Sequence, residues 1–182
     1  MLNFPHLKYP PIKYKLPDKL IYHSKIYSHG FRIEKFDMFS TNANCKARGE
    51  MYCFKEEIYR PDTDFVPSLY IDFLFSTHSG KGFGTALLNF ARNYSKQIGC
   101  NGRLHLMASS HIIPQKIPHI FYKKYGFNSV DKNTNKELDK FIKKHKTATY
   151  KDFMNTQMYY PPIKFKENKL LAFFENLFSI NP

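Results

Sequence analysis

The sequence predicts an α/β (α+β) domain with a mixed sheet that contains one parallel pair of strands. An apolar run from Ser68 to Phe75 has the length and composition of a strand. A glycine-rich loop follows it and leads into a helical pattern from Thr85 to Ile98. A second strand-like run, Arg103 to Ala108, comes next. A strand, a helix and a strand in this order form a crossover unit, so the two strands are expected to run parallel.

Length and composition are typical of a single soluble domain. The chain has 182 residues, with 18 Phe, 13 Tyr and no Trp, so much of the core is expected to be aromatic. Its three cysteines form no C-x-x-C pair and are expected to be reduced thiols. The N-terminus lacks a signal-peptide pattern, and no apolar run approaches the ~18 residues of a membrane span. We therefore expect a cytoplasmic protein without a membrane partner.

The formal net charge of +13 has two interpretations. It indicates either attraction to a polyanion or a generally basic surface that has no special partner. The lysines are scattered along the chain and form no long block. This distribution favours a solvated basic surface over a nucleic-acid interface.

The first half of the chain carries extended patterns. Residues 1–19 contain four prolines and are expected to form an extended arm on the body. Strands are predicted over 20–27, 31–39 and 50–59, with a loop at 40–44 and a turn at Pro61-Asp62. The run 68–75 is apolar nearly throughout, which predicts a central strand covered on both faces.

Helical patterns dominate the second half. The helix over 85–98 carries an apolar stripe and is expected to stop at Gly99. A short helix is predicted from Pro118 to Gly126, and a short strand over 128–131. Thr134 to Glu137 matches a capping box that would open another helix, and 156–160 fits a last strand. Residues 1–162 are thus expected to form one domain.

The C-terminal segment 163–182 places apolar side chains at helical spacing. We expect an amphipathic helix packed on its own domain. A helix that binds a partner or forms a homodimer is the alternative.

The glycine loop Gly80-Lys81-Gly82-Phe83-Gly84 lies between a strand and a helix, where free backbone amides can hold an anion. It lacks the Gly-Lys-Ser/Thr of a Walker A loop and the glycine spacing of a dinucleotide fold. Lys81-Gly82-Phe83-Gly84 matches the opening of an RNA-recognition RNP1 strand. The match fails afterwards, because the chain continues into a helix.

A second motif lies about forty residues downstream, at Phe121-Tyr122-Lys123-Lys124-Tyr125-Gly126-Phe127. Together with Ser79-Gly80-Lys81-Gly82-Phe83-Gly84, it resembles the GNAT superfamily of acyl-CoA-dependent N-acyltransferases. The first segment is similar to that family's [Q/R]-x-x-G-x-[G/A] loop and the second to its "fYeklGF" ending. The resemblance is firm over residues 68–127. It implies a mixed, mostly antiparallel sheet with one splayed parallel pair and helices on both faces.

The resemblance also implies direct transfer of an acetyl group from acetyl-CoA to an amine, in a ternary complex without a metal. The amides of the loop and helix start would hold the phosphates, and the backbone of the preceding strand would bond the pantetheine arm. The residues implied are Leu74, Phe75, Ser76, Ser79, Gly80, Lys81, Gly82, Phe83, Gly84, Thr85 and Gln115. Ser79 departs from the usual Gln or Arg, for which Lys81 is expected to compensate. Gln115 stands where the family often has Asn.

Three side chains are implied in the chemistry. Tyr122 stands where family members carry a tyrosine that protonates the leaving thiolate, and a buried structural tyrosine is the alternative. Asp72 is the expected base that accepts the proton of the amine, and Glu50 is the second choice. Either carboxylate is alternatively a solvated or hydrogen-bonded residue.

The sequence does not identify the acceptor. Four histidines flank the expected cleft without metal-site spacing, and Cys100 is expected to be buried. The positive charge disfavours a polyamine unless Asp72, Glu50, Glu56 and Glu57 gather at the site. Two other functions remain open: a basic RNA- or ribosome-binding protein that uses Lys81 to Gly84, and a CoA-binding fold that has lost catalysis.

Overall fold

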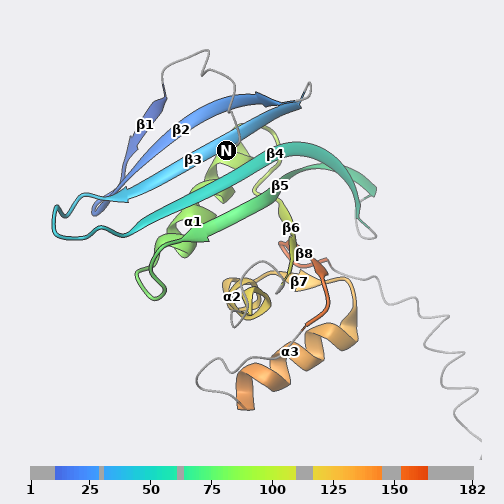
Figure 1. Cartoon of the computed structure of the whole chain (residues 1–182). Coiled ribbons are helices and arrows are strands. Elements are labelled where there is room, and N and C mark those ends of the chain that lie inside the picture. Colours follow the sequence, from blue (N-terminus) through green and yellow to red (C-terminus); the bar gives the residue numbers. More distant parts are fainter. Residues whose placement is uncertain (1–10, 29–30, 61–63, 110–116, 145–152, 164–182) are drawn as a thin grey trace, which may run out of the picture.

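The computed structural model describes residues 11–28, 31–60, 64–109, 117–144 and 153–163. Its strands form one eight-stranded sheet in the order β1-β2-β3-β4-β5-β6-β8-β7 (Figure 1). Every neighbouring pair is antiparallel except β5 and β6, which are parallel. The strands are β1 (Ile12–Lys15), β2 (Lys19–Ser28), β3 (Phe31–Ser40), β4 (Arg48–Arg60), β5 (Asp64–Ser76), β6 (Leu104–Ala108), β7 (Asn128–Ser129) and β8 (Thr156–Tyr160).

The prediction of a mixed α/β domain with one parallel pair is confirmed, and the sheet is mostly antiparallel. The strands predicted over 20–27, 31–39, 50–59 and 68–75 are present and longer than expected. The expected extended arm contains β1, which pairs with β2 from Ile12 opposite His23 to Lys15 opposite Leu20. Helices on both faces of the sheet remain a prediction.

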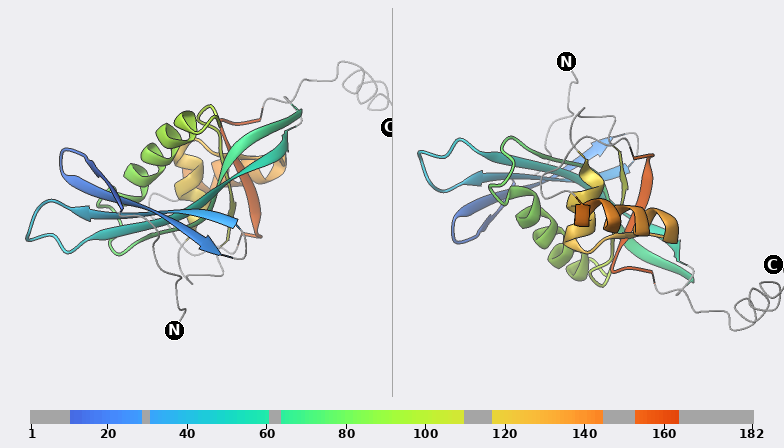
Figure 2. Two further views of the ribbon diagram at one scale, coloured as in Figure 1. Left: turned by 90° about the horizontal axis from the view of Figure 1, so that it is seen from above. Right: turned by 90° about the horizontal axis from the view of Figure 1, so that it is seen from below.

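Helix α1 (Phe83–Gln97) lies across one face of the long strands (Figure 2). It begins two residues before the predicted Thr85 and ends at Gln97, shortly before Gly99, whose positive φ of 83° suits a glycine. Its buried side chains pack on Phe36, Met51, Leu69 and Leu106 of the sheet in a single core. Glycine at position 49 permits this close packing, because a Cβ there would lie 2.9 Å from Leu87 Cδ1 and would displace that side chain.

The opposite face of β3, β4 and β5 is only half covered. Asp72 on β5 is exposed, and its neighbours Phe73, Leu74 and Phe75 are half-buried. The prediction that this strand is covered on both faces is therefore wrong over these residues. Among the described helices, α1 packs on β3 to β5, and it covers only one of their two faces.

Helix α2 (Pro118–Tyr125) packs on β6, and α3 (Lys132–Lys144) packs on α2 and β7. The short helix starting at Pro118 and ending at Gly126 is as predicted, with Gly126 at φ 114°. The prediction that a capping box at Thr134 opens α3 is wrong. The helix starts at Lys132 because the Asp131 carboxylate accepts hydrogen bonds from the backbone N–H groups of Asn133 and Thr134, at 3.1 and 2.8 Å.

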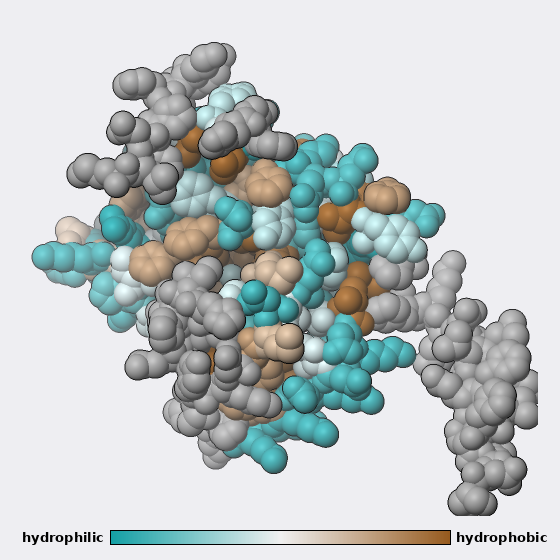
Figure 3. Space-filling view, turned by 45° about the vertical axis from the view of Figure 1, so that its right-hand side comes forward, coloured by the Kyte–Doolittle hydropathy of each residue, from teal (hydrophilic) through white to brown (hydrophobic). Residues whose placement is uncertain are grey.

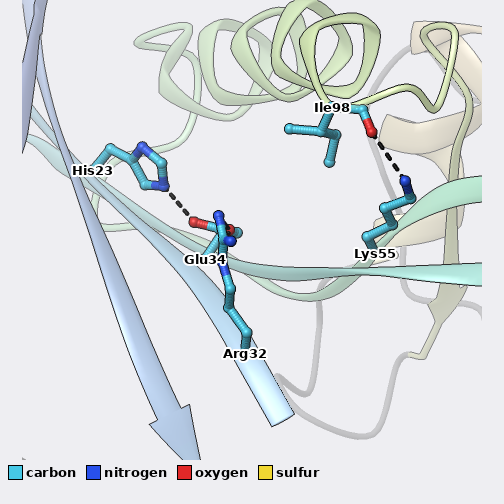
Figure 4. Close-up of polar contacts among 5 residues, drawn as sticks. All are labelled: His23, Arg32, Glu34, Lys55 and Ile98. Carbon is cyan, nitrogen blue, oxygen red and sulfur yellow. Dashed lines mark hydrogen bonds and ion pairs between the residues drawn. The ribbon is translucent and has the colours of Figure 1, made fainter.

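A buried charged cluster lies between α1 and strands β2 and β3. Glu34 is 4% exposed, and its carboxylate contacts His23 Nε2 at 2.5 Å and Arg32 Nε at 2.7 Å (Figure 4). The Tyr94 side chain of α1 also interacts with Glu34. Burial raises the pKa of Glu34, but the hydrogen bond from His23, the interaction with Tyr94 and the charge of Arg32 outweigh it, so this pKa lies below its ordinary value.

The end of α1 is held by a cation. Lys55 Nζ donates to the Ile98 carbonyl at 3.1 Å, which satisfies one of the last carbonyls of the helix (Figure 4). The first turns of α1 pack on β4 at Gly49, so both ends of the helix are fixed to the sheet.

The hydrophilic surface is unevenly distributed. Figure 3 shows hydrophilic side chains over the end of the molecule where α3 lies. Five exposed lysines lie on this helix: Lys132, Lys136, Lys140, Lys143 and Lys144. No described helix is long and apolar enough to cross a membrane. The predicted helix over 163–182 and the turn at Pro61-Asp62 lie outside the described residues, apart from Ile163.

Candidate functional site

Strands β5 and β6 pair over only three residues and then separate. Their parallel register runs from Leu69 opposite Leu104 to Ile71 opposite Leu106. Beyond this point β5 continues to Ser76 beside β4, and β6 continues to Ala108 beside β8. The sheet therefore opens on the carboxyl side of its single parallel pair, and such openings are where open α/β sheets bind ligands.

A cleft of about 590 Å³ occupies this opening. The end of β5 forms one wall, and Met107 and Ser109 at the end of β6 form the other. The glycine loop and first turn of α1 close one end, and the start of α2 closes another. Four chain segments that are distant in sequence thus converge on one cavity.

A β-bulge accompanies the separation of the strands. Tyr52 of β4 lies opposite Phe73, whereas the next residue, Cys53, lies opposite Ile71, so Asp72 is an extra residue in β5. Bulges end regular pairing and redirect side chains. Backbone amides of a strand point alternately to its two sides, so some of those after Asp72 point away from β4 toward the cleft.

The glycine loop adopts a conformation that requires glycine. Gly80 has φ 76° and Gly82, the N-cap of α1, has φ 73°, while a Cβ at either position would meet open space. Glycine is thus needed at both positions for its backbone conformation and not for lack of space. Gly84 differs, because a Cβ there would lie 3.0 Å from the ring of Phe121. This close approach brings the first turns of α1 and α2 together at the cleft.

The positive charge at the N-terminal end of α1 is not neutralised by a side chain of its first turn, so this end can bind an anion. No side chain caps it, and no acidic residue lies in its first turn. The Ala86 amide is the first that bonds within the helix, to Gly82 at 2.9 Å. The amides of Phe83, Gly84 and Thr85 therefore have no intrahelical acceptor, and they carry the positive end of the helix dipole beside the cleft.

The loop that leads to this helix is tied to β4. Thr77 and Arg48 share three hydrogen bonds. The Thr77 N–H and Oγ1 donate to the Arg48 carbonyl at 3.0 and 3.2 Å, and Oγ1 accepts from the Arg48 N–H at 3.0 Å. Ser76 Oγ also donates to the His78 carbonyl at 3.0 Å. These bonds fix where the glycine loop begins.

Tyr122 lies in the cleft wall on α2. Its ring is 9% exposed and packs on Phe121 and Phe127, with ring centroids 5.2 and 5.7 Å away. Burial raises the pKa of Tyr122 to about 12. The phenol is therefore protonated throughout the neutral range and can donate a hydrogen bond.

The two candidate carboxylates have different surroundings. Asp72 lines the cleft, is exposed, and forms no hydrogen bond or ion pair with another described residue. Glu50 does not line the cleft. It accepts a hydrogen bond from the Tyr52 hydroxyl at 2.6 Å and pairs with Lys35 Nζ at 3.3 Å. Asp72 is thus the carboxylate that is free to accept a proton at the cleft.

Most of the predicted binding residues come together in the cleft wall. These are Leu74, Phe75, Ser76, Ser79, Gly80, Gly82, Phe83, Gly84 and Thr85. Lys81 is exposed and is not part of the wall, so its expected compensation for Ser79 remains a prediction. Gln115 lies outside the described residues.

Other reactive side chains take structural positions. Burial raises the pKa of the Cys100 thiol, which makes it a poor nucleophile. His105 is fully buried and contacts Glu56 Oε1 at 2.5 Å and Ser68 Oγ at 2.9 Å. His78 does line the cleft, and no metal-binding group occurs among the described residues.

The loop does not have the geometry of an RNA-stacking motif. Phe83, which would stack on a base, is 3% exposed and packs in the core as the first residue of α1. Its ring is therefore not accessible to a base.

Sequence reasoning missed several cleft residues. Met107, Ile117 and Phe121 line the cavity with apolar surface, and Phe73 lies at its edge. Met107 is 47% exposed on a strand whose other residues are buried, but this exposure is visible only in the structure. These residues have no signal in the sequence, because apolar residues of a cleft wall resemble those of a core.

Comparisons with protein-family models, curated proteins and solved structures find no match to this chain. The function of the cleft is therefore argued from its geometry and chemistry.

Proposed function

We propose that the protein is an N-acetyltransferase that moves an acetyl group from acetyl-CoA directly to an amine. The observation that carries this proposal is the separation of β5 and β6 beside the unneutralised start of α1. A thioester on a long, narrow arm with a pyrophosphate at its other end suits such a cleft. Its phosphates match the free amides of α1, and its arm matches apolar walls and strand amides.

The wall chemistry supports this substrate. Leu74, Ile117 and Phe121 provide apolar surface for the arm. Backbone amides of β5 that point away from β4 can donate to the amide carbonyls of the arm and polarise the thioester carbonyl. No acidic side chain of the first helical turn opposes the phosphates.

The reaction balances with the residues at hand. Asp72, directly or through water, takes one proton from the ammonium, and the freed lone pair attacks the thioester carbon. When the intermediate collapses, the carbon–sulfur bond breaks and the thiolate receives a proton from Tyr122. The nitrogen then loses its second proton to the tyrosine oxygen. The products are the N-acetylated amine, CoA with a free thiol, and one proton released to solvent.

The pKa of Tyr122 defines its role. A phenol with a pKa of about 12 is a weaker acid than an ordinary thiol, so it protonates a thiolate unfavourably by itself. Transfer becomes favourable when the strongly acidic nitrogen of the intermediate returns a proton to the same oxygen. Tyr122 therefore relays a proton from nitrogen to sulfur rather than acting as an independent acid.

The binding step is tested with Thr85→Glu. Thr85 is exposed, lies in the first turn of α1 and lines the cleft. A glutamate there stabilises the helix by about 0.3–1 kcal/mol while repelling a pyrophosphate. We expect the variant to keep or raise its melting temperature and to lose the thermal shift with acetyl-CoA. Saturating ligand at ~100 Kd should stabilise the wild type by about 2.7 kcal/mol.

Two controls separate charge from shape. Thr85→Gln removes the added charge and should bind acetyl-CoA better than Thr85→Glu. Asn93→Glu adds the same charge at an exposed position later in α1 and should bind normally. Absence of any shift with millimolar acetyl-CoA in the wild type would reject the proposal. Binding without release of CoA thiol from any amine tested would instead indicate a fold that has lost catalysis.

A further inference from the structure

A second hollow adjoins the cleft on the face of the sheet that α1 does not cover. It is a shallow, open depression lined by Glu50 and Tyr52 of β4 and by Asp72 and Phe73 of β5. We call it the open-face hollow. Asp72 and Phe73 line both this hollow and the cleft. A molecule in the hollow therefore reaches the cleft at Asp72.

Aromatic rings form much of the floor of the hollow. The rings of Tyr52 and Phe73 lie 5.9 Å apart, and Phe73 is stacked at 6.2 Å on Phe75 of the adjoining cleft. Phe73 and Phe75 are half-buried rather than packed into the core. Partly exposed ring faces attract organic cations and alkyl chains, and the Tyr52 ring already has Lys35 Nζ 5.8 Å from its centroid.

The charges around the hollow are negative in an otherwise basic protein. Lys35 Nζ pairs with Asp37 at 3.0 Å and with Glu50 at 3.3 Å. Asp72 lies beyond these pairs and has no cationic partner among the described residues. Two carboxylates thus flank the Lys35 ammonium group, and the unpaired carboxylate of Asp72 lies on the same face. Three negative charges against one positive charge leave an excess of two, which a dication would balance.

The spacing of Glu50 and Asp72 indicates the length of that dication. Asp72 is the bulged residue beside Tyr52, and Glu50 is two residues before Tyr52 on the same strand. Two residues of a strand span roughly 6.6 Å, and the neighbouring strand is roughly 4.8 Å away, so the two positions are roughly 8 Å apart. This is a spacing of backbone positions, and the reach of the two side chains allows both carboxylates to pair with the nitrogens of a short diamine, such as one with an alkyl chain of about four or five carbons.

We propose that the open-face hollow binds the acceptor, and that the acceptor is an aliphatic diamine whose second ammonium group pairs with Glu50 while its reacting nitrogen lies at Asp72. This inference rests on the proposed acetyl transfer. The alkyl chain lies on the rings of Tyr52 and Phe73. The Tyr52 hydroxyl donates to Glu50 Oε1 at 2.6 Å and so orients the carboxylate that receives the second cation.

The binding mode has a consequence for the product. Acetylation of the nitrogen at Asp72 converts an ammonium into a neutral amide, so the product carries one charge instead of two. The product therefore loses its attraction to Asp72 and leaves the hollow more easily than the substrate.

The test compares acceptors that differ in one charge. CoA release is measured with 1,4-diaminobutane, with butylamine and with 4-aminobutanoate, which share a four-carbon chain. We expect kcat/KM for the diamine to exceed that for butylamine by at least about tenfold and to exceed that for the amino acid by more. Glu50→Gln should lower the ratio of diamine to butylamine by about tenfold.

Glu57→Gln is the matched control. It removes the same charge from an exposed residue of the same strand that lies outside the hollow, so the ratio should be unchanged. Equal or higher kcat/KM for butylamine, or an unchanged ratio in Glu50→Gln, would overturn the inference while leaving acetyl transfer intact.

A direct titration separates the two proposals. The diamine is titrated calorimetrically into the wild type and into Glu50→Gln without acetyl-CoA, and the wild type should bind it more tightly. If acetyl-CoA fails to bind, acetyl transfer is rejected, but this titration still decides whether the hollow binds a diamine. Equal affinity of the two proteins would reject the diamine site.

Discussion

Two charged groups lie on opposite faces of the sheet, meet at strand β3, and differ in how completely their charges are paired. Under α1, Glu34 is buried and bonded by His23 and Arg32. On the open face, the adjacent residue Lys35 begins a group that ends at the unpaired Asp72. Neighbouring residues of a strand point to opposite faces, so one residue of sequence separates the two environments.

The difference separates stability from function. A buried carboxylate must be fully hydrogen-bonded, because an unpaired one costs several kcal/mol. An exposed carboxylate has no such requirement and remains available to a ligand. The group under α1 is therefore expected to stabilise the fold, and the open-face group to bind and react.

The largest expected effect concerns activity at Asp72. Asp72→Asn should reduce acetyl transfer by about 10²–10⁴-fold, because it removes the proton acceptor beside the cleft. The melting temperature and the thermal shift with acetyl-CoA should stay close to those of the wild type. Steady-state release of CoA thiol measures acetyl transfer. Differential scanning fluorimetry measures the melting temperature and the thermal shift. Full activity of this variant would remove Asp72 from the mechanism.

A loss of stability is expected at Glu34. Glu34→Ala leaves His23 and Arg32 without their buried partner and should cost about 3–5 kcal/mol in the free energy of unfolding. Asp72→Ala should change the free energy of unfolding by less than about 0.5 kcal/mol. Urea denaturation measures both. Similar losses in the two variants would break the distinction between the faces.

Acid should act through the same buried carboxylate. The pKa of Glu34 in the folded protein lies below its ordinary value of 4.5, so the unfolded chain takes up the proton first as pH falls. Its contribution to stability is complete above about pH 4.5 and is lost as pH falls through the lower native pKa. The urea midpoints of the wild type and of Glu34→Gln should therefore converge at low pH. A constant difference down to pH 2 would contradict this.

The smallest effect is expected at Asp37. Its ion pair with Lys35 is partly exposed, so Asp37→Asn should cost less than about 1 kcal/mol of unfolding free energy. The effect should shrink further in 1 M salt, where screening weakens surface pairs. Chemical denaturation at two salt concentrations checks it. A loss as large as that of Glu34→Ala would show that the open face is also structural.

The sequence by itself determined the elements and the local geometry of the glycine loop. Apolar patterning predicted most strands and the α1 and α2 helices, and the strand–helix–strand order predicted the parallel pair. Gly80 and Gly82 could be singled out because their positive φ values are a local requirement. The start of α3 was misassigned, because Asp131 and Thr134 are both suitable caps and only the observed bonds distinguish them.

Only the tertiary structure decided how the carboxylates differ. Glu50 and Asp72 both lie on strands among apolar residues, and nothing local distinguishes them. The bulge at Asp72 and the pairing of Glu50 with Lys35 and Tyr52 depend on which strands lie side by side. The cleft itself arises where β6 leaves β5 to follow β8, and this divergence depends on long-range pairing that short-range sequence patterns do not encode.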